Sequence, residues 1–252
     1  MIKVLLSMSI IILCCFFDSV YANEKVKVSS PPSIWVQQQG NSLKGPIIDL
    51  LNEIFSEYNL SIESEILPWA RAVSHMKSGL LDIIPVIFYT DDRSKFMKFT
   101  LPYTQVQTSV FVPKGKKFSF KTLNDLKGRR GLIMRDDSIS SEFKKFLPVL
   151  TLTNIVQYKD ILKMLIDNRA DYAVAAKFGF IIESKKLGLE NEIEALPIPI
   201  SYRNLHFAFS KKSQFVKYVT IINKKLKKMK ADGSLEKMVN KTICLASGNK
   251  PK

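Results

Sequence analysis

The chain has few of the residues on which disulfide-stapled and metal-binding proteins depend. It contains three cysteines, and two of them, Cys14 and Cys15, lie in an apolar N-terminal segment that we expect to be removed. Only Cys244 then remains, so the mature chain can hold neither an internal disulfide nor a thiolate metal cluster. Its stability must therefore come from packed hydrophobic cores.

Motifs typical of common enzymes are also missing. The sequence has two histidines, His75 and His206, which are far apart in the chain. It has no glycine-rich phosphate loop and no HExxH, GxSxG or CxxC motif, and no serine or cysteine stands at a readable spacing from a histidine and an acid. We therefore predict no catalytic residue, no metal and no cofactor.

Acidic charge is scarce, because 38 lysines and arginines face 23 aspartates and glutamates, for a net charge of +15. Such a balance favours anionic ligands or surfaces. Only one dense group of lysines occurs, on a predicted helix whose apolar residues recur every three or four positions. Those apolar residues are Phe215, Val219, Ile222, Leu226 and Met229, and the lysines on the other faces are Lys224, Lys225, Lys227, Lys228 and Lys230. This pattern predicts a solvated helix face and no nucleic-acid partner.

The N-terminus has the features of a signal peptide. Lys3 precedes an apolar run from Val4 to Phe17, and Val20-Tyr21-Ala22 offers small residues for cleavage before Asn23. A membrane anchor is disfavoured because the run is shorter than the roughly 20 residues that a span needs. A lipoprotein anchor is disfavoured because Ile12-Leu13, rather than small residues, precede the cysteines. We expect a signal peptide over 1–22 and a periplasmic or secreted protein.

Short apolar runs alternate with amphipathic helices through most of the chain, which predicts an α/β fold. Strands are expected at 25–29, 61–66, 82–88, 106–112, 130–134, 155–156, 171–175 and 205–209. Helices are expected to begin at Pro46 and Pro68, to cover 123–128, 140–146, 161–168 and 177–186, and to lie on either side of Asp232-Gly233.

Two apolar strands, near 106–112 and 205–209, bracket the middle of the chain. This pattern predicts two lobes joined by two crossing strands. Lobe 1 would comprise 23–112 and 205–252, and lobe 2 would comprise 113–204. A crevice between two α/β lobes is a natural ligand site, and two crossing strands permit closure around a ligand.

Arg93 is the strongest candidate for a ligand contact. Thr90 can cap a short helix that begins at Asp91, directly after the buried strand, and this places Arg93 in the first turn. Its planar guanidinium suits a carboxylate. A surface arginine paired with Asp91 or Asp92 fits the spacing equally well, so both interpretations stay open.

Other candidates lie near strand ends and helix starts. Trp69 follows Pro68 at a helix start and could serve as an aromatic platform, and Arg71 could reach the same crevice. Phe88 and Tyr89 end the buried strand. For the aromatic residues the alternative is core packing, and for Arg71 it is a position facing water.

In the second half, Asp136, Asp137 and Ser138 join a strand to a helix, where free N–H groups can bind an anion. Lys177 follows the strand at 171–175. An ordinary capping loop and a solvated lysine are the alternatives here.

Several of these segments, taken in order, resemble solute-binding protein family 3, the polar amino-acid-binding proteins of ABC transporters. The resemblance covers about residues 25–239 and rests on Gly45-Pro-Ile-Ile-Asp49, the Trp69 segment with Gly79 and Asp82, Thr90-Asp-Asp-Arg93, Phe99-Thr-Leu-Pro-Tyr103, Leu123-Asn-Asp-Leu-Lys-Gly128 and Asp232-Gly233. It implies the two-lobed periplasmic binding protein fold of type II.

The same resemblance assigns roles to the candidates. Arg93 matches the arginine that grips a ligand carboxylate, and Trp69 matches an aromatic residue that stacks on the ligand. Trp35 lies in the loop where a second aromatic usually covers the ligand. Asp136 to Ser138 match the loop of the second lobe that completes carboxylate binding.

One position departs from the family pattern. Amino-acid binders place an aspartate for the α-ammonium group where this chain has Ala175-Ala176-Lys177, so a carboxylate without an ammonium group fits better. The predicted function is capture of a small polar or anionic, amino-acid-like solute by a monomer, for delivery to the membrane permease of an ABC transporter. The alternatives are an enzyme similar to cyclohexadienyl dehydratase and a ligand-sensing subunit.

Overall fold

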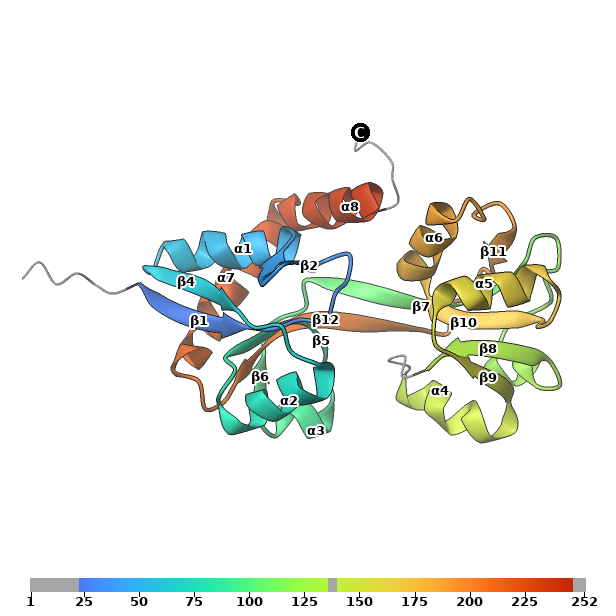
Figure 1. Ribbon diagram of the computed structural model, residues 1–252, viewed down its shortest axis with the longest axis horizontal. Coiled ribbons are helices and arrows are strands. Elements are labelled where there is room, and N and C mark those ends of the chain that lie inside the picture. The colour runs from blue at the N-terminus through green and yellow to red at the C-terminus, as the bar shows by residue number, and fades with distance from the viewer. Residues whose placement is uncertain (1–22, 136–139, 247–252) are drawn as a thin grey trace, which may run out of the picture.

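The computed structural model describes residues 23–135 and 140–246. Helices and strands alternate along most of this length and form a mixed α/β structure, as predicted (Figure 1). The predicted signal peptide (1–22), the candidates Asp136, Asp137 and Ser138, and the C-terminal residues 247–252 lie outside the described residues.

Most of the expected elements fall at or close to the predicted positions, and the structure adds four strands of three residues each that were not predicted. The strands are β1 (Glu24–Val28), β2 (Gln37–Gln39), β3 (Ser42–Lys44), β4 (Leu60–Ser64), β5 (Ile83–Phe88), β6 (Met97–Phe99), β7 (Thr104–Pro113), β8 (Arg130–Met134), β9 (Thr151–Ile155), β10 (Tyr172–Ala176), β11 (Ile193–Ala195) and β12 (Ser201–Ser210). The helices are α1 (Pro46–Ser56), α2 (Trp69–Ser78), α3 (Asp91–Ser94), α4 (Ser141–Phe146), α5 (Tyr158–Ile166), α6 (Lys177–Lys186), α7 (Tyr218–Ala231) and α8 (Ser234–Ala246). Three short 3-10 helices are η1 (Leu123–Leu126), η2 (Leu147–Val149) and η3 (Gln214–Lys217).

One continuous sheet runs through the molecule in the order β4-β1-β5-β12-β7-β10-β8-β9. The strands at its two ends pair in parallel, β1 with β4 and β5, and β8 with β9 and β10. In the middle, β12 and β7 pair antiparallel with each other and with the neighbouring strands. The parallel end sections thus alternate with helices, as the sequence pattern predicts.

The two middle strands carry the chain between the two ends of the sheet (Figure 1). Residues 201–205 of β12 pair with residues 104–108 of β7. Beyond this shared segment, β12 continues along β5 through Phe209, whereas β7 continues along β10 through Phe111. The shared segment is therefore the only part of the described sheet that joins the two ends.

Hydrophobic cores divide in the same way. Two clusters draw on residues 26–103 and 205–235, and two others draw on residues 110–196. Figure 1 shows helices on both faces of each section, with α1 opposite α2 and α5 opposite α4. Val110, Phe111 and Val112 pack in the cores of the second section. The predicted lobe boundaries at 112/113 and 204/205 stay a prediction.

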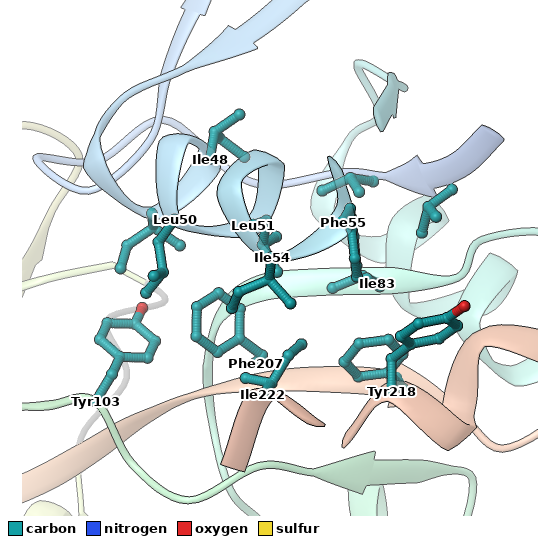
Figure 2. Packing of buried hydrophobic residues seen from close by; sticks show 14 of the residues in the cluster. Ile48, Leu50, Leu51, Ile54, Phe55, Ile83, Tyr103, Phe207, Tyr218 and Ile222 are labelled. Atoms are coloured by element: carbon teal, nitrogen blue, oxygen red, sulfur yellow. The ribbon is translucent and has the colours of Figure 1, made fainter. Parts of the chain in front are cut away.

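Helix α1 shows how the sequence builds the largest core. Pro46 begins it, and Ile47, Leu51, Ile54 and Phe55 point onto the sheet and are almost fully buried. Figure 2 shows Leu51, Ile54 and Phe55 packed against Ile83, Phe207 and Ile222 from the other elements of the cluster. Burying each such side chain contributes about 1.5–3 kcal/mol, so this helix is firmly held.

Gly45, just before α1, sets the path of the loop that carries Trp35. Its φ is +119°, and a Cβ atom here would lie 2.8 Å from the carbonyl oxygen of Trp35. Only glycine combines this backbone conformation with so close an approach. The glycine therefore allows the loop before β2 to rest on the start of α1.

The lysine-rich segment forms α7. Tyr218, Val219, Ile222 and Leu226 are buried, while the lysines at 224, 227, 228 and 230 are exposed, as predicted. Lys225 forms an ion pair with Glu53 of α1. Within residues 23–135 and 140–246, no helix is both long and apolar enough to span a bilayer.

Candidate ligand-binding site

A cavity of about 530 Å³ lies where the two sections of the sheet meet. Parts of both sections line it, together with the strands β7 and β12 that join them. From the first section come Pro31, Pro32, Ser33, Ile34, Trp35, Trp69, Val86, Ile87, Phe88 and Arg93, from the joining strands Val106, Thr108 and Leu205, and from the second section Met134, Arg135, Tyr158, Ala176, Phe178 and Gly179.

Arg93 is fixed at the cavity wall by its own short helix. The side-chain oxygen of Thr90 accepts a hydrogen bond of 3.2 Å from the Arg93 backbone N–H. The Nη1 atom of Arg93 donates a 2.9 Å hydrogen bond to the carbonyl oxygen of Phe88, at the end of β5. These two bonds orient the guanidinium without using all its donors.

The electrostatic state of Arg93 is unusual for an arginine. It is half-buried, and burial lowers its pKa, although an arginine keeps its proton in proteins. Among the described residues, no carboxylate lies within ion-pair distance of it. A partly desolvated cation that lacks a described counterion favours an anionic ligand.

The two tryptophans lie at different depths. Trp69, the first residue of α2, is 38% exposed, and the Cζ atom of Arg93 lies 5.1 Å from the centre of its ring. This distance is within the range of a cation–π contact. Trp35 is 4% exposed and packs edge-on against Tyr103, with ring centres 6.2 Å apart. Trp35 thus contributes a buried wall of the cavity, and Trp69 contributes an accessible face.

The two aromatic residues at the end of β5, Phe88 and Tyr89, lie in different surroundings. Phe88 lines the cavity, and the Cζ atom of Arg203 from β12 lies 3.9 Å from the centre of its ring. Tyr89 does not line the cavity. It is 50% exposed, donates a hydrogen bond to Asp91 and packs on Phe99. Arg71 is exposed and is also not among the lining residues.

Five of the six described lining residues of the second section lie at two strand ends, those of β8 and β10. Met134 ends β8 and Arg135 follows it, whereas Ala176, Phe178 and Gly179 lie where β10 passes into α6. Lys177 is half-buried and is not a lining residue. Of Ala175, Ala176 and Lys177, the stretch that the resemblance matches to the ammonium-binding aspartate, only Ala176 is among the described lining residues.

The described lining is positively charged and otherwise mostly apolar. Its charged residues are Arg93 and Arg135, and no aspartate or glutamate belongs to it. Ser33, Thr108 and Tyr158 add hydroxyl groups. Such a lining can hold a carboxylate at one end and an apolar group at the other.

Several lining residues were not predicted from the sequence. Tyr158 begins α5 directly after β9, and Phe178 stands one residue beyond the predicted Lys177. Both lie at a strand-to-helix junction, which is the signal that led to Arg93, so the same rule applied to β9 would have found Tyr158.

Comparison with known families decides the class of this molecule. The model of the bacterial extracellular solute-binding proteins, family 3, matches residues 25–243. The chain belongs to this family. The match spans almost all of the described residues, so the resemblance predicted from the motifs is confirmed.

A curated relative of this family 3 protein agrees in class. The probable amino-acid-binding protein YxeM of Bacillus subtilis is 24% identical over 208 residues, which cover 81% of this chain and 77% of the relative. The name of that relative describes an amino-acid-binding protein, which agrees with the family match.

Two solved structures share the fold. An amino-acid ABC transporter substrate-binding protein of Streptococcus pneumoniae, bound to L-arginine, has a TM-score of 0.69 at 18% identity and covers 92% of this chain and 99% of its own. A histidine kinase sensor domain similar to periplasmic binding proteins has a TM-score of 0.68 at 20% identity and covers 88% of this chain and 96% of its own. The predicted type II periplasmic binding protein fold, with two lobes joined by two strands, is confirmed.

Proposed function

We propose that this family 3 protein binds a small anionic, amino-acid-like solute in the cavity between its lobes and releases it unchanged. The observation that carries the proposal is the half-buried guanidinium of Arg93. It is oriented by the Phe88 carbonyl, and among the described residues it has no carboxylate partner. A ligand carboxylate would complete its hydrogen bonds and neutralise its charge.

The lobes are proposed to close on this solute by bending of the shared segment of β7 and β12. That segment, 104–108 with 201–205, is the only connection between the two sections of the described sheet. Hinges of this kind need only a few residues that change their backbone angles. Closure would bring Arg135 and Phe178 toward Arg93 and Trp69.

Delivery to the permease of an ABC transporter is the proposed biological step. Membership of an extracellular family supports it, together with the predicted signal peptide cleaved near Ala22. The proposed site of action is the periplasm or the space outside the cell, and the proposed state is a monomer.

The test begins with native mass spectrometry of the purified protein, to identify any retained solute. Isothermal titration with amino acids and with small mono- and dicarboxylates should then show saturable binding of at least one anion. Each bound compound is then recovered, and its mass is measured by mass spectrometry to detect any chemical change. Conversion of any of them into a product would overturn the proposal in favour of an enzyme, and the absence of anion binding would overturn it altogether.

A further inference from the structure

We infer that the exposed lysine face of α7 binds an anionic phospholipid surface. This lysine ridge consists of Lys217, Lys224, Lys227 and Lys228, and none of these residues lines the ligand cavity. Three features carry the inference: the spacing of the lysines, the scarcity of acids that could neutralise them, and the kinds of side chain that α7 presents.

The spacing places the lysines on one face of the helix. Lys227 and Lys228 lie three and four residues after Lys224, so their Cβ atoms are about 5–6 Å from that of Lys224. Lys217 lies seven residues before Lys224, which is about two helical turns, and it continues the same line. All four side chains are exposed. The opposite face of α7 is buried in the largest core, so the ridge is held at the surface on a firm support.

Nearby acids do not neutralise the ridge. Helix α7 itself contains no acid, and in the part of the chain that the structure describes none of the four lysines forms an ion pair. Lys225, which is not part of the ridge, pairs with Glu53. Asp232, just beyond the helix, accepts a 2.9 Å hydrogen bond from the backbone N–H of Ser234, and hydrogen bonds from Ser234 lower its pKa more than Lys228 does.

The remaining residues of the chain leave this charge in place. Outside the described residues, the acidic side chains are Asp18, in the predicted signal peptide, and Asp136 and Asp137, which stand between β8 and α4 of the second lobe in the sequence. The C-terminal residues 247–252 contain two lysines and no acidic side chain. The first lobe therefore carries an uncompensated positive ridge.

The side chains of α7 suit a lipid surface better than a nucleic acid. The helix contains no arginine, and its one aromatic residue, Tyr218, is buried. Surfaces that bind nucleic acids use arginine forks and exposed rings that stack on bases. Lysine ammonium groups are hydrated point charges, and a layer of anionic headgroups attracts them without demanding a particular geometry.

The attachment would be electrostatic and reversible. Among the described residues of α7, no large apolar side chain is exposed, so none is available to enter the acyl layer. Each lysine near an anionic membrane strengthens binding about fivefold, so four of them give a loose but useful attachment. Because the family is extracellular, such an attachment would keep the protein close to the outer face of the membrane that holds its proposed permease.

The experiment measures sedimentation of the protein, without its predicted signal peptide, with lipid vesicles. One set contains phosphatidylcholine alone, and the other contains phosphatidylglycerol and phosphatidylcholine in equal parts. Binding should be stronger to the anionic vesicles and should fall as salt is added, because salt screens exposed charges. The triple variant Lys224→Gln, Lys227→Gln, Lys228→Gln should bind the anionic vesicles at least about tenfold more weakly. The same three changes to arginine keep the charge and should retain binding.

Lys127, Lys144 and Lys145 provide the matched control. They are exposed, belong to the second lobe and form no ion pair within the described residues. Their replacement by glutamine removes the same net charge and should leave most of the vesicle binding intact. Thermal unfolding should be similar for both triple variants, because all the replaced side chains are exposed.

Four results would overturn the inference. The wild type could show no preference for anionic vesicles, or the ridge variant could bind them as well as the wild type does. An equal loss in the two triple variants would show that net charge, and not the ridge, is responsible. Finally, duplex DNA could bind the ridge as tightly as the anionic vesicles do at the same phosphate concentration, and the partner would then not be a lipid surface.

Discussion

The guanidinium of Arg93 is held by neutral groups. A backbone carbonyl accepts one of its N–H groups, a threonine caps its helix, and an indole ring lies 5.1 Å away. None of these contacts cancels the charge. The side chain is therefore oriented before the ligand arrives, and this lowers the entropy lost on binding.

Replacement of Arg93 by alanine should weaken the binding of any carboxylate ligand by about 2–5 kcal/mol, because a buried anion would lose its partner. Arg93→Lys should recover only part of the loss, since an ammonium group cannot form a bidentate contact. Isothermal titration measures both effects, and thermal unfolding checks that the variants are folded. An unchanged affinity in the alanine variant would remove Arg93 from the site.

His206 should make stability depend on pH. It is buried in β12, its Nδ1–H donates a 2.8 Å hydrogen bond to the Thr100 carbonyl, and the Phe99 ring packs against it. Burial lowers its pKa, and the hydrogen bond opposes this only in part. The unfolded chain therefore takes up a proton below about pH 6.5 before the folded protein does.

The free energy of unfolding should consequently fall as the pH decreases below about 6.5, and His206 should have no such effect above that pH. The His206→Asn variant keeps a donor for Thr100 and removes the titration. Urea unfolding at several pH values between about 5.5 and 7 should give it a smaller slope than the wild type. Equal slopes would show that His206 is not the cause.

At the scale of single elements, α3 is the part of the structure that positions the candidate anchor. It has four residues, too few to be stable alone, and Thr90 supplies its side-chain cap. The Thr90→Ala variant should lose about 0.5–2 kcal/mol of local stability, and its ligand affinity should fall because Arg93 is less well held.

Thr122 provides the matched control for this prediction, because it caps η1 in the second lobe, away from the cavity lining. Thr122→Ala should lower stability by a similar amount and leave affinity unchanged. If both variants bind ligand equally well in titration, the cap of α3 has no role in positioning Arg93.

The elements that could be predicted from sequence are those with an apolar pattern. Strand β8 lies at the predicted residues and helix α1 begins at the predicted Pro46, because a buried run defines the strand and amphipathic spacing defines the helix. The hairpin of β2 and β3 is polar and mostly exposed, so periodicity could not reveal it, although Gly40-Asn41 is a recognised turn pair. Strand β9 is an edge strand with many polar residues. The sequence pattern therefore predicted only its last residue, Ile155, as part of a strand.

The site could be predicted in part for a similar reason. Sequence reasoning reached the right strand ends, and Trp35, Trp69, Phe88 and Arg93 do line the cavity. Which of two neighbouring residues faces the cavity depends on how the strand or helix is rotated about its own axis. Phe88 and Tyr89 point to opposite sides, as successive residues near a strand end do.

Helix phase has the same effect on Arg71, which is two positions after Trp69 and is therefore turned about 200° around α2. Lys177 and Phe178 also lie on different sides of the first turn of α6. Which side of a helix faces the cavity can be determined only when the positions of the neighbouring elements are known.

At the scale of the whole molecule, ligand binding should close the lobes. Both tryptophans of the chain line the cavity, and Trp69 is far more exposed than Trp35. Closure should therefore change the fluorescence emission mainly through Trp69. The Trp69→Phe variant should lose most of the ligand-induced change, and Trp35→Phe should keep it.

Small-angle scattering should report closure independently as a smaller radius of gyration in the presence of a bound ligand. A ligand that binds in titration and leaves the scattering unchanged would show that the cavity fills without movement of the lobes.

The path of the chain through the two lobes also sets an order of assembly during synthesis. The cores of the second lobe need only residues 110–200, one uninterrupted stretch. The cores of the first lobe combine residues 26–103 with residues 205–235. These cores therefore cannot be completed until the C-terminal part of the chain has been synthesised. The apolar face of α1 is covered only in part until β12 and α7 emerge, and a nascent chain of this protein has an aggregation hazard that ends only with its last two helices.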